Sequence, residues 1–171
     1  DLYAGTGKGL TLESPELRSD LKEHVLDRWI FARLGELVRD TTLGYERYEL
    51  DTATRPLGEF IDDLSTWYVR RSRDRFKTEG KDKEAALAAL RYALLTVAKV
   101  MAPVMPFFAD DLYRRMGGGE SVHLADWPSA LQIDKVLLKD MAAVRTTASK
   151  ALEARERAGI KIRQPLGRLT C

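Results

Sequence analysis

Basic side chains are concentrated in one short stretch of this sequence. Arg70, Arg71, Arg73 and Arg75 lie within six residues, and Lys77 follows. The guanidinium group is always charged and presents several donors that match phosphate and carboxylate oxygens. Because the whole chain carries a net charge of only +2, this local cluster is its candidate surface for a polyanion such as a nucleic acid.

The residues before these arginines have the spacing of an amphipathic helix. The apolar positions recur every three or four residues and are Leu57, Phe60, Ile61, Leu64 and Tyr68. Extending this stripe by one heptad reaches Arg71, and Arg75 follows four residues later. Charged groups at the end of a core stripe need either buried acids or an anionic ligand. Arg70 and Arg73 lie off the stripe, where a solvated surface is the simpler interpretation.

Other patterns that could carry chemistry are incomplete. Glu120 and His123 have the spacing of a carboxylate-bridged di-metal helix, but such sites need two copies on helices. A single copy follows three glycines here, so a metal-dependent four-helix enzyme would require this pair to lie on a helix. Residues 5–9, Gly-Thr-Gly-Lys-Gly, lack the spacing of a phosphate-binding loop, and a flexible linker is favoured. The sequence therefore predicts no catalytic residue and no metal site.

Length and composition indicate one soluble globular domain. The chain has 171 residues, of which 44% are hydrophobic and 32% charged, enough apolar material for a core. Its single cysteine, Cys171, excludes an internal disulfide and suits a reducing cytosol. No signal peptide or membrane-spanning run is present in the sequence. A cytoplasmic location without membrane contact is the expectation.

Hydrophobic periodicity predicts an all-α helical bundle of four to five helices with a short C-terminal strand-like segment. A helix start is expected at Ser14-Pro15-Glu16. The expected helices are then about 25–49, 54–77, 82–102, 107–116 and 134–158. Pro56 favours Thr54 over Asp51 as the cap of the second helix, because the missing N–H does no harm in a first turn. Ile160, Ile162 and Gln164 alternate with basic residues, as in a half-buried strand.

Several single residues carry structural expectations. Gly35, inside the first helix, is expected to allow close packing of a neighbouring helix, and Trp29 is expected in a core or an interface. Phe108 and Leu112 are expected to pack the fourth helix against the bundle. Trp127 could stack on a base, although covering the open end of a helical core is the favoured role. The other structural or stacking candidate is Trp67, and His24 is expected at the surface.

Four segments of the chain resemble the anticodon-binding domain of isoleucyl-tRNA synthetases, and they occur in the family's order. They are Leu26-Asp27-Arg28-Trp29-Ile30, residues 62–76 around Trp67-Tyr68-Val69-Arg70-Arg71, residues 121–128 with His123 and Trp127, and Ile160-Lys161-Ile162-Arg163-Gln164-Pro165-Leu166. The first segment is also similar to valyl enzymes. The second and the last segments point to the isoleucyl branch, so the resemblance covers most of the chain.

The resemblance implies a role in RNA recognition. The parent enzyme attaches isoleucine to its tRNA with ATP and magnesium, but both class I catalytic signatures and the zinc-binding cysteines are absent from this sequence. No cofactor is therefore expected here. The implied partners are the anticodon stem-loop of isoleucine tRNA and the catalytic and C-terminal domains of the same polypeptide.

In related class I enzymes the loop-contacting position falls on Asp74, Arg75 and Phe76. Guanidinium and aromatic stacking on splayed bases is the chemistry expected there. The expected RNA-binding residues are Arg70, Arg71, Arg73, Arg75, Phe76 and Lys77. Where the family often has tryptophan, this chain has Lys77, which favours charge contact over stacking at that position.

The resemblance also divides the chain. Residues 1–13 are expected to be a flexible leader, 14–159 the helical domain, and 160–171 the start of the following junction domain. The chain begins without a methionine and is expected to be an excised piece that lacks the family's preceding helix. Without that helix, apolar surface on the first and third helices is expected to be uncovered. Such surface is expected to make the chain self-associate. The alternative function is a helical protein-interaction module with Trp29 or Trp127 as a hot spot.

Overall fold

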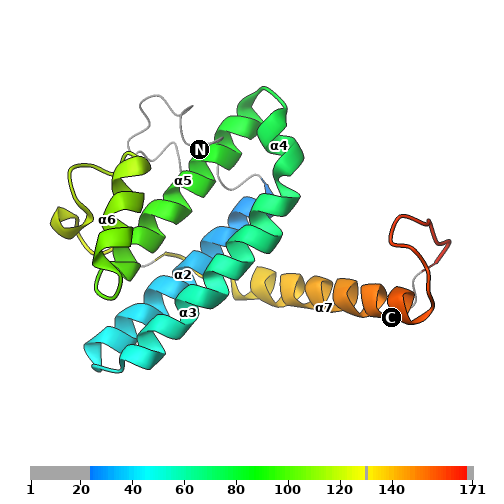
Figure 1. Ribbon diagram of the computed structural model, residues 1–171, viewed down its shortest axis with the longest axis horizontal. Helices are drawn as coiled ribbons and strands as arrows, with labels where there is room; N and C mark the ends of the chain where they lie inside the picture. Colours follow the sequence, from blue (N-terminus) through cyan, green and yellow to red (C-terminus); the bar gives the residue numbers. More distant parts are fainter. Residues whose placement is uncertain (1–23, 130, 169–171) are drawn as a thin grey trace. The chain divides into compact units, whose positions relative to one another are not determined.

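The computed structural model describes residues 24–129 and 131–168, and its regular elements there are all helical (Figure 1). They are α2 (Val25–Glu46), α3 (Leu50–Asp62), the π-helical segment η1 (Asp63–Val69), α4 (Arg73–Lys77), α5 (Lys81–Met101), α6 (Pro106–Arg115), the 3-10 turn η2 (Val122–Leu124) and α7 (Lys135–Arg157). The prediction of an all-α bundle is confirmed. The expected leader and the helix start near Ser14 lie outside the described residues. None of the described helices has the length and apolar composition needed to cross a bilayer.

The chain divides into two compact units, one ending at Ile133 and the other beginning at Asp134. In the first unit α2 packs against both α3 and α5, and α6 packs on α5 (Figure 1). The largest fully buried apolar side chains there include Trp29, Ile30, Leu34, Phe60, Tyr68 and Leu95. Ala86, Ala89 and Ala93 line the buried side of α5, where small side chains let its neighbours approach closely. The expected position of Trp29 in the core is thus confirmed.

The hairpin between α2 and α3 depends on Gly44. A Cβ added at this position would lie 2.6 Å from the backbone N and Cα of Ala53, which is fully buried. The turn between the helices is held by hydrogen bonds from Tyr48 N to Tyr45 O and from Glu49 N to Gly44 O. Glycine therefore sets the close approach of the two helices at this end.

Replacing Gly44 by alanine is expected to lower the free energy of unfolding by about 1–3 kcal/mol, because the methyl group meets backbone that cannot rotate away. Gly58→Ala is the matched control, since a Cβ at this exposed α3 position meets nothing within 4 Å. There the better helix propensity of alanine should stabilise the protein by about 0.5–1 kcal/mol. Urea unfolding of both variants measures the difference, and equal effects would contradict this account of the hairpin.

The start of α3 differs from the prediction. Glu49 occupies the cap position, the helix begins at Leu50, and Pro56 lies inside it. The Thr54 hydroxyl does not cap the helix but donates to Leu50 O. Pro56 leaves the carbonyl of Thr52 without its helical partner, and Thr52 is exposed, so water can take that place. The short turn after α2 starts the helix early, and this outweighs the preference of proline for a first turn.

Two packing expectations are also corrected. A Cβ at Gly35 would meet Ile133 Cγ1 at 3.1 Å and Leu131 Cβ at 3.3 Å, so this glycine faces the chain segment after residue 130, not a neighbouring helix. On α6, Phe108 is 56% exposed, whereas Ala109 and Tyr113 face the core. The Tyr113 ring lies where a side chain at Gly118 would be, at 2.5 Å. Tyr113, and not Phe108, is therefore the aromatic residue of α6 that packs against the rest of the first unit.

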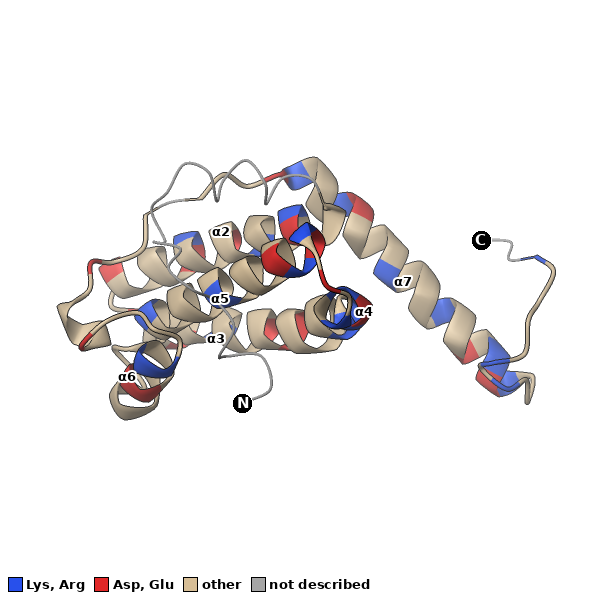
Figure 2. Cartoon of the chain, turned by 90° about the horizontal axis from the view of Figure 1, so that it is seen from above, with Lys and Arg blue, Asp and Glu red and all other residues tan. Residues whose placement is uncertain are grey.

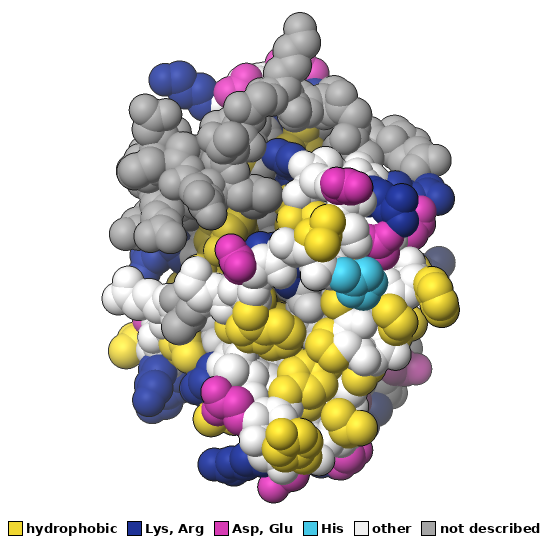
Figure 3. Space-filling view, turned by 90° about the vertical axis from the view of Figure 1, so that its left-hand side faces the viewer, with side chains coloured by type: hydrophobic (Ala, Val, Ile, Leu, Met, Phe, Trp, Pro, Cys, Tyr) yellow, Lys and Arg dark blue, Asp and Glu magenta, His cyan; other side chains and the backbone are white. Residues whose placement is uncertain are grey.

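Exposed apolar side chains occur around α6 and η2, and Figure 3 shows hydrophobic side chains gathered on the face of the molecule at this side. The large exposed ones in this part of the chain are Met105, Phe107, Phe108, Leu124 and Trp127. The resemblance placed uncovered apolar surface on the first and third helices instead. Self-association itself stays a prediction.

The second unit consists of α7 and the segment that follows it. The Asp134 carboxylate caps α7 by accepting from Leu137 N at 3.0 Å, and Gly159 ends it with a φ of +65°, so both predicted ends are confirmed. The strand expected at residues 160–164 is wrong: these residues form an irregular turn. The Arg155 guanidinium donates to three of its carbonyls, those of Lys161, Ile162 and Gln164. The described residues provide no partner strand for this segment, and Arg155 binds its carbonyl groups instead.

Candidate nucleic-acid interface

The helix that carries the basic cluster is interrupted, although the sequence predicted one continuous α-helix to Lys77. After α3 the backbone passes through the π-helical η1, then residues 70–72, and then the short α4. π-helical turns are rare and often mark functional sites. Both ends of η1 are tied to α2: Asp63 accepts from Arg33 Nε at 2.7 Å, and the Tyr68 hydroxyl donates to Asp27 at 2.7 Å.

The interruption changes which side chains face the core. Beyond Tyr68 the buried positions are Ser72 and Phe76, each four residues further on, and not Arg71. Arg71 is exposed. The prediction that Arg71 extends the core stripe is therefore wrong, because that prediction assumed an unbroken α-helical period through residues 63–72.

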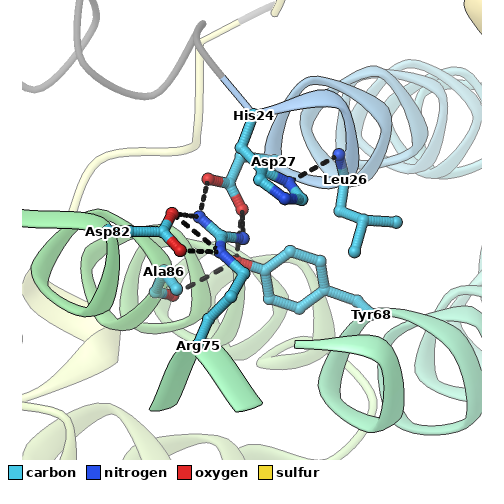
Figure 4. A network of polar contacts seen from close by, with 7 residues as sticks. All are labelled: His24, Leu26, Asp27, Tyr68, Arg75, Asp82 and Ala86. Carbon is cyan, nitrogen blue, oxygen red and sulfur yellow. Dashed lines mark hydrogen bonds and ion pairs between the residues drawn. The ribbon is translucent and has the colours of Figure 1, made fainter. Parts of the chain in front are cut away.

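A buried carboxylate binds the second arginine of the predicted stripe. Asp27 is fully buried, and its two oxygens accept from the Arg75 Nη1 and Nη2 atoms at 2.8 Å each (Figure 4). The Tyr68 hydroxyl reaches both Asp27 and the carbonyl of Ala86, at 2.7 and 3.1 Å. The buried acids that the sequence left as one alternative for these arginines are thus present for Arg75.

Asp82, in the first turn of α5, completes this network. Its carboxylate accepts from Arg75 Nε at 2.9 and 3.0 Å, although the Asp82 side chain is 60% exposed. The Arg75 side chain, by contrast, is only 9% exposed. We call Asp27, Tyr68, Arg75 and Asp82 the Asp27 clasp; it joins α2, η1, α4 and α5.

The contacts within the clasp shift the pKa values of Arg75, Tyr68 and Asp82 away from neutral pH. Burial alone lowers the pKa of Arg75, but its hydrogen bonds to Asp27 and Asp82 raise that pKa by more, so it lies above the usual arginine value. Burial also raises the pKa of Tyr68, and the neighbouring Asp27 charge adds to the effect. The hydrogen bond from Arg75 holds the pKa of Asp82 below its usual value. Near neutral pH the clasp is a permanent ion-pair network with a neutral tyrosine, a structural element and not an acid–base pair.

The remaining predicted residues divide by exposure. Arg70, Arg71, Arg73 and Lys77 are all exposed, and none of them forms an ion pair with a described residue. The Arg71 guanidinium lies over the Trp67 ring, 5.1 Å from its centroid, in a cation–π contact. Phe76 is only 3% exposed. We call residues 70–77 the basic tip: four of its cations face solvent, while Arg75 and Phe76 hold it to the bundle.

Asp27 is the important residue that sequence reasoning did not single out. An acid three residues before Ile30 and seven before Leu34, on the face of the helix that is otherwise apolar, is a signal of a buried charge that needs a partner. The sequence also shows an arginine, Arg75, on an apolar stripe, which likewise needs a partner. The sequence alone does not show that Asp27 and Arg75 pair with each other, because they lie 48 positions apart.

Trp127 is held by protein contacts on α2. Its indole N–H donates to Thr42 Oγ1 at 2.8 Å, and its ring packs edge-on to Tyr45 with centroids 5.8 Å apart. This agrees with the favoured role of covering the end of the helical core. Val122–Leu124 forms a 3-10 turn, so Glu120 and His123 do not share an α-helical face. No group of three potential metal ligands occurs among the described residues.

A second anchored carboxylate fixes the corner between α6 and η2. Asp110 accepts from Ser121 Oγ at 2.7 Å and from Val122 N at 3.0 Å, and it pairs with Arg114. The hydrogen bond from Ser121, followed by those from Val122 and Arg114, lowers the pKa of Asp110 to about 2. The charged carboxylate thus holds the chain that leads to Trp127.

The hydrogen-bonded Asp110 carboxylate predicts that the stability of the protein depends on pH. A carboxyl group whose pKa falls from 3.8 to about 2 on folding contributes stability that is fully present above pH 3.8 and is lost as the pH falls toward 2. Asp110→Asn should therefore be less stable than the unmodified protein at pH 6, and the difference should shrink between pH 4 and pH 2. Urea midpoints across this range measure the effect. Asp111→Asn, which removes an exposed pair with Arg115, is the control; a constant difference for Asp110→Asn would contradict the prediction.

An exposed cluster of basic side chains on a helical bundle is a common feature of nucleic-acid-binding modules. Comparison with known families makes the class specific: residues 27–170 match the family described as the anticodon-binding domain of tRNA ligase. The chain belongs to this family.

Individual relatives agree with this assignment. The chain is 48% identical over 145 residues to an isoleucine–tRNA ligase of Deinococcus radiodurans, covering 82% of this chain and 14% of the relative. It is 42% identical over 175 residues to the isoleucine–tRNA ligase of Thermobifida fusca, covering 98% of this chain and 16% of the relative. An isoleucine–tRNA ligase of Methanopyrus kandleri is 42% identical over 161 residues, which are 88% of this chain and 15% of that relative. The chain therefore spans about one-sixth or less of the length of the curated relatives it matches.

Proposed function

We propose that this chain is the anticodon-binding domain of an isoleucine–tRNA ligase and that it binds the anticodon stem-loop of isoleucine tRNA. The observation that carries this proposal is the family match over residues 27–170 together with the exposed basic tip. The relatives that match over most of the chain share the name isoleucine–tRNA ligase. The rest of such a polypeptide would supply ATP- and magnesium-dependent attachment of isoleucine in the cytoplasm.

The side chains proposed to contact the RNA are the exposed cations of the basic tip, Arg70, Arg71, Arg73 and Lys77. Arg71 lies over Trp67, which restricts its rotation, so less side-chain entropy is lost when it binds. A guanidinium restricted in this way can stack on a splayed base, while its neighbours contact phosphates. Stacking by one arginine and phosphate contacts by the others are the interactions expected with a single-stranded loop.

Arg75 and Phe76 were expected from the sequence to touch the RNA as well. We propose instead that they do not contact the RNA and that they hold the basic tip in place. All three guanidinium nitrogens of Arg75 are already engaged by Asp27 and Asp82, and Phe76 is buried. Their contribution would be to hold α4 against α2 and α5, so that the exposed cations keep one arrangement.

Titration with RNA hairpins tests the proposal. The chain is mixed with the anticodon stem-loop of isoleucine tRNA and, separately, with a hairpin that has the same stem and a different loop, at 50 and 200 mM salt. Tighter binding of the first hairpin, weakening steeply as salt rises, is the expected result. Equal affinities would contradict anticodon recognition, and no binding to either hairpin would contradict the RNA-binding function itself.

A further inference from the structure

The two units of the chain differ in charge. Residues 134–168 contain nine lysines and arginines but only four aspartates and glutamates, whereas residues 1–133 contain 19 basic and 22 acidic residues. The positive net charge of the chain thus lies wholly in the second unit. Figure 2 shows Lys and Arg recurring along α7. An excess of positive charge confined to one unit indicates a polyanionic partner for that unit.

The basic residues of α7 are not spread evenly around the helix. At 100° per residue, Lys135, Lys139, Lys150 and Arg157 fall within a sector of about 60°, and all four are exposed. Of these four, Lys135, Lys139 and Lys150 form no ion pair with a described residue, and Arg157 pairs with Glu153, an acid that falls in the same sector. The face extends about 33 Å along the helix axis.

The turn after α7 carries further exposed basic residues. The Arg155 guanidinium donates to the carbonyls of Lys161, Ile162 and Gln164. These bonds fold the turn back onto the end of the helix and leave Lys161 and Arg163 exposed beside it. We call the exposed basic residues of this unit the α7 cationic face; they are Lys135, Lys139, Lys150, Arg157, Lys161, Arg163 and Arg168.

The composition of the second unit restricts the kind of contact. Residues 134–168 contain no phenylalanine, tyrosine or tryptophan. Single-stranded bases are usually held by aromatic stacking, whereas double-stranded RNA is bound through its phosphates and 2′-hydroxyls. Lysine side chains can bind phosphates as flexible point charges, without the planar bidentate geometry that arginine provides.

We propose that the α7 cationic face binds the phosphate backbone of the paired stem of the RNA, independently of base sequence. The inference rests on the proposed function and extends it: the basic tip contacts the loop, and the second unit contacts the stem. Contacts of this kind strengthen binding and its salt dependence without adding selectivity between anticodons.

The test uses the triple variant Lys139→Gln, Lys150→Gln, Lys161→Gln in the 171-residue chain. Its affinity for the hairpins should fall about tenfold or more at 50 mM salt, and the slope of log K against log salt should decrease by about one for each phosphate that is no longer neutralised. The ratio of affinities for the two hairpins should not change. A loop-only oligonucleotide should bind the variant and the unmodified chain equally. Circular dichroism checks that α7 remains folded.

The matched control removes three exposed charges from the first unit: Arg39→Gln, Arg47→Gln, Arg55→Gln. If it loses as much affinity as the α7 variant, the effect is general charge and the inference is overturned. An unchanged salt slope in the α7 variant, with the unmodified chain still binding the hairpin, also overturns it and leaves the proposed function intact. If the unmodified chain binds no hairpin, both fail.

Discussion

Replacing Asp27 by asparagine is expected to lower the free energy of unfolding by about 3–5 kcal/mol. Removing one partner of a buried ion pair leaves the other charge without compensation in a low-dielectric environment. Asp27 is fully buried and accepts from both Nη atoms of Arg75 and from Tyr68. Asparagine has nearly the same shape but no charge, and its amide group would face a donor.

Asp82→Asn is the matched control for this loss, because it removes the other carboxylate bound to the same guanidinium. The Asp82 side chain is 60% exposed, so water can replace it, and the expected loss is below about 1 kcal/mol. Urea unfolding at neutral pH measures both variants. Similar losses for the two would mean that the clasp is an ordinary surface ion pair.

Replacing Arg70, Arg71 and Arg73 together by glutamine is expected to weaken binding of the anticodon stem-loop about a hundredfold or more. A stacked base contact contributes about 1–3 kcal/mol, and each phosphate contact adds a salt-dependent part. All three side chains are exposed, so the variant should keep the stability of the unmodified protein. Hairpin titration with unfolding measured in parallel separates the two quantities.

Single substitutions refine this prediction. Arg71→Ala should lose more affinity than Arg73→Ala, because only Arg71 is held over Trp67. Arg75→Ala should also weaken binding, but together with a loss of stability, since it leaves the buried Asp27 unpaired. Equal, small losses at all three positions with unchanged stability would indicate a diffuse charged surface and contradict the roles assigned to Arg71 and Arg75.

The clasp explains how a buried contact and an exposed surface are linked. α4 is only five residues long, and a helix of this length is not stable by itself. Its orientation therefore depends on Arg75 and Phe76, which bind it to α2 and α5. Loss of Asp27 should free the basic tip as well as weaken the core, so Asp27→Asn is expected to bind RNA less tightly even where it remains folded.

The amino-acid sequence by itself determined the all-α class of the described part of the chain and the approximate ends of most helices, but not the division of the second predicted helix into α3, η1 and α4. Periodicity and the helix-ending Gly159 are local signals, and each acts within a few residues. For that reason α2, α5 and α7 were predicted with ends close to those observed. The same local signals were wrong at Pro56 and at residues 160–164, where the adjacent turn and the Arg155 side chain decided the conformation.

Only the tertiary structure decided which arginines are free to bind a ligand. The spacing of Arg71 and Arg75 placed both on one stripe, yet the π-helical η1 shifts the helical phase and leaves Arg71 exposed. Arg75 is occupied because Asp27, 48 residues earlier in the chain, is brought against it by the packing of α2. A charged side chain is available or engaged according to its neighbours in space, and those neighbours come from other helices, beyond the reach of any local pattern.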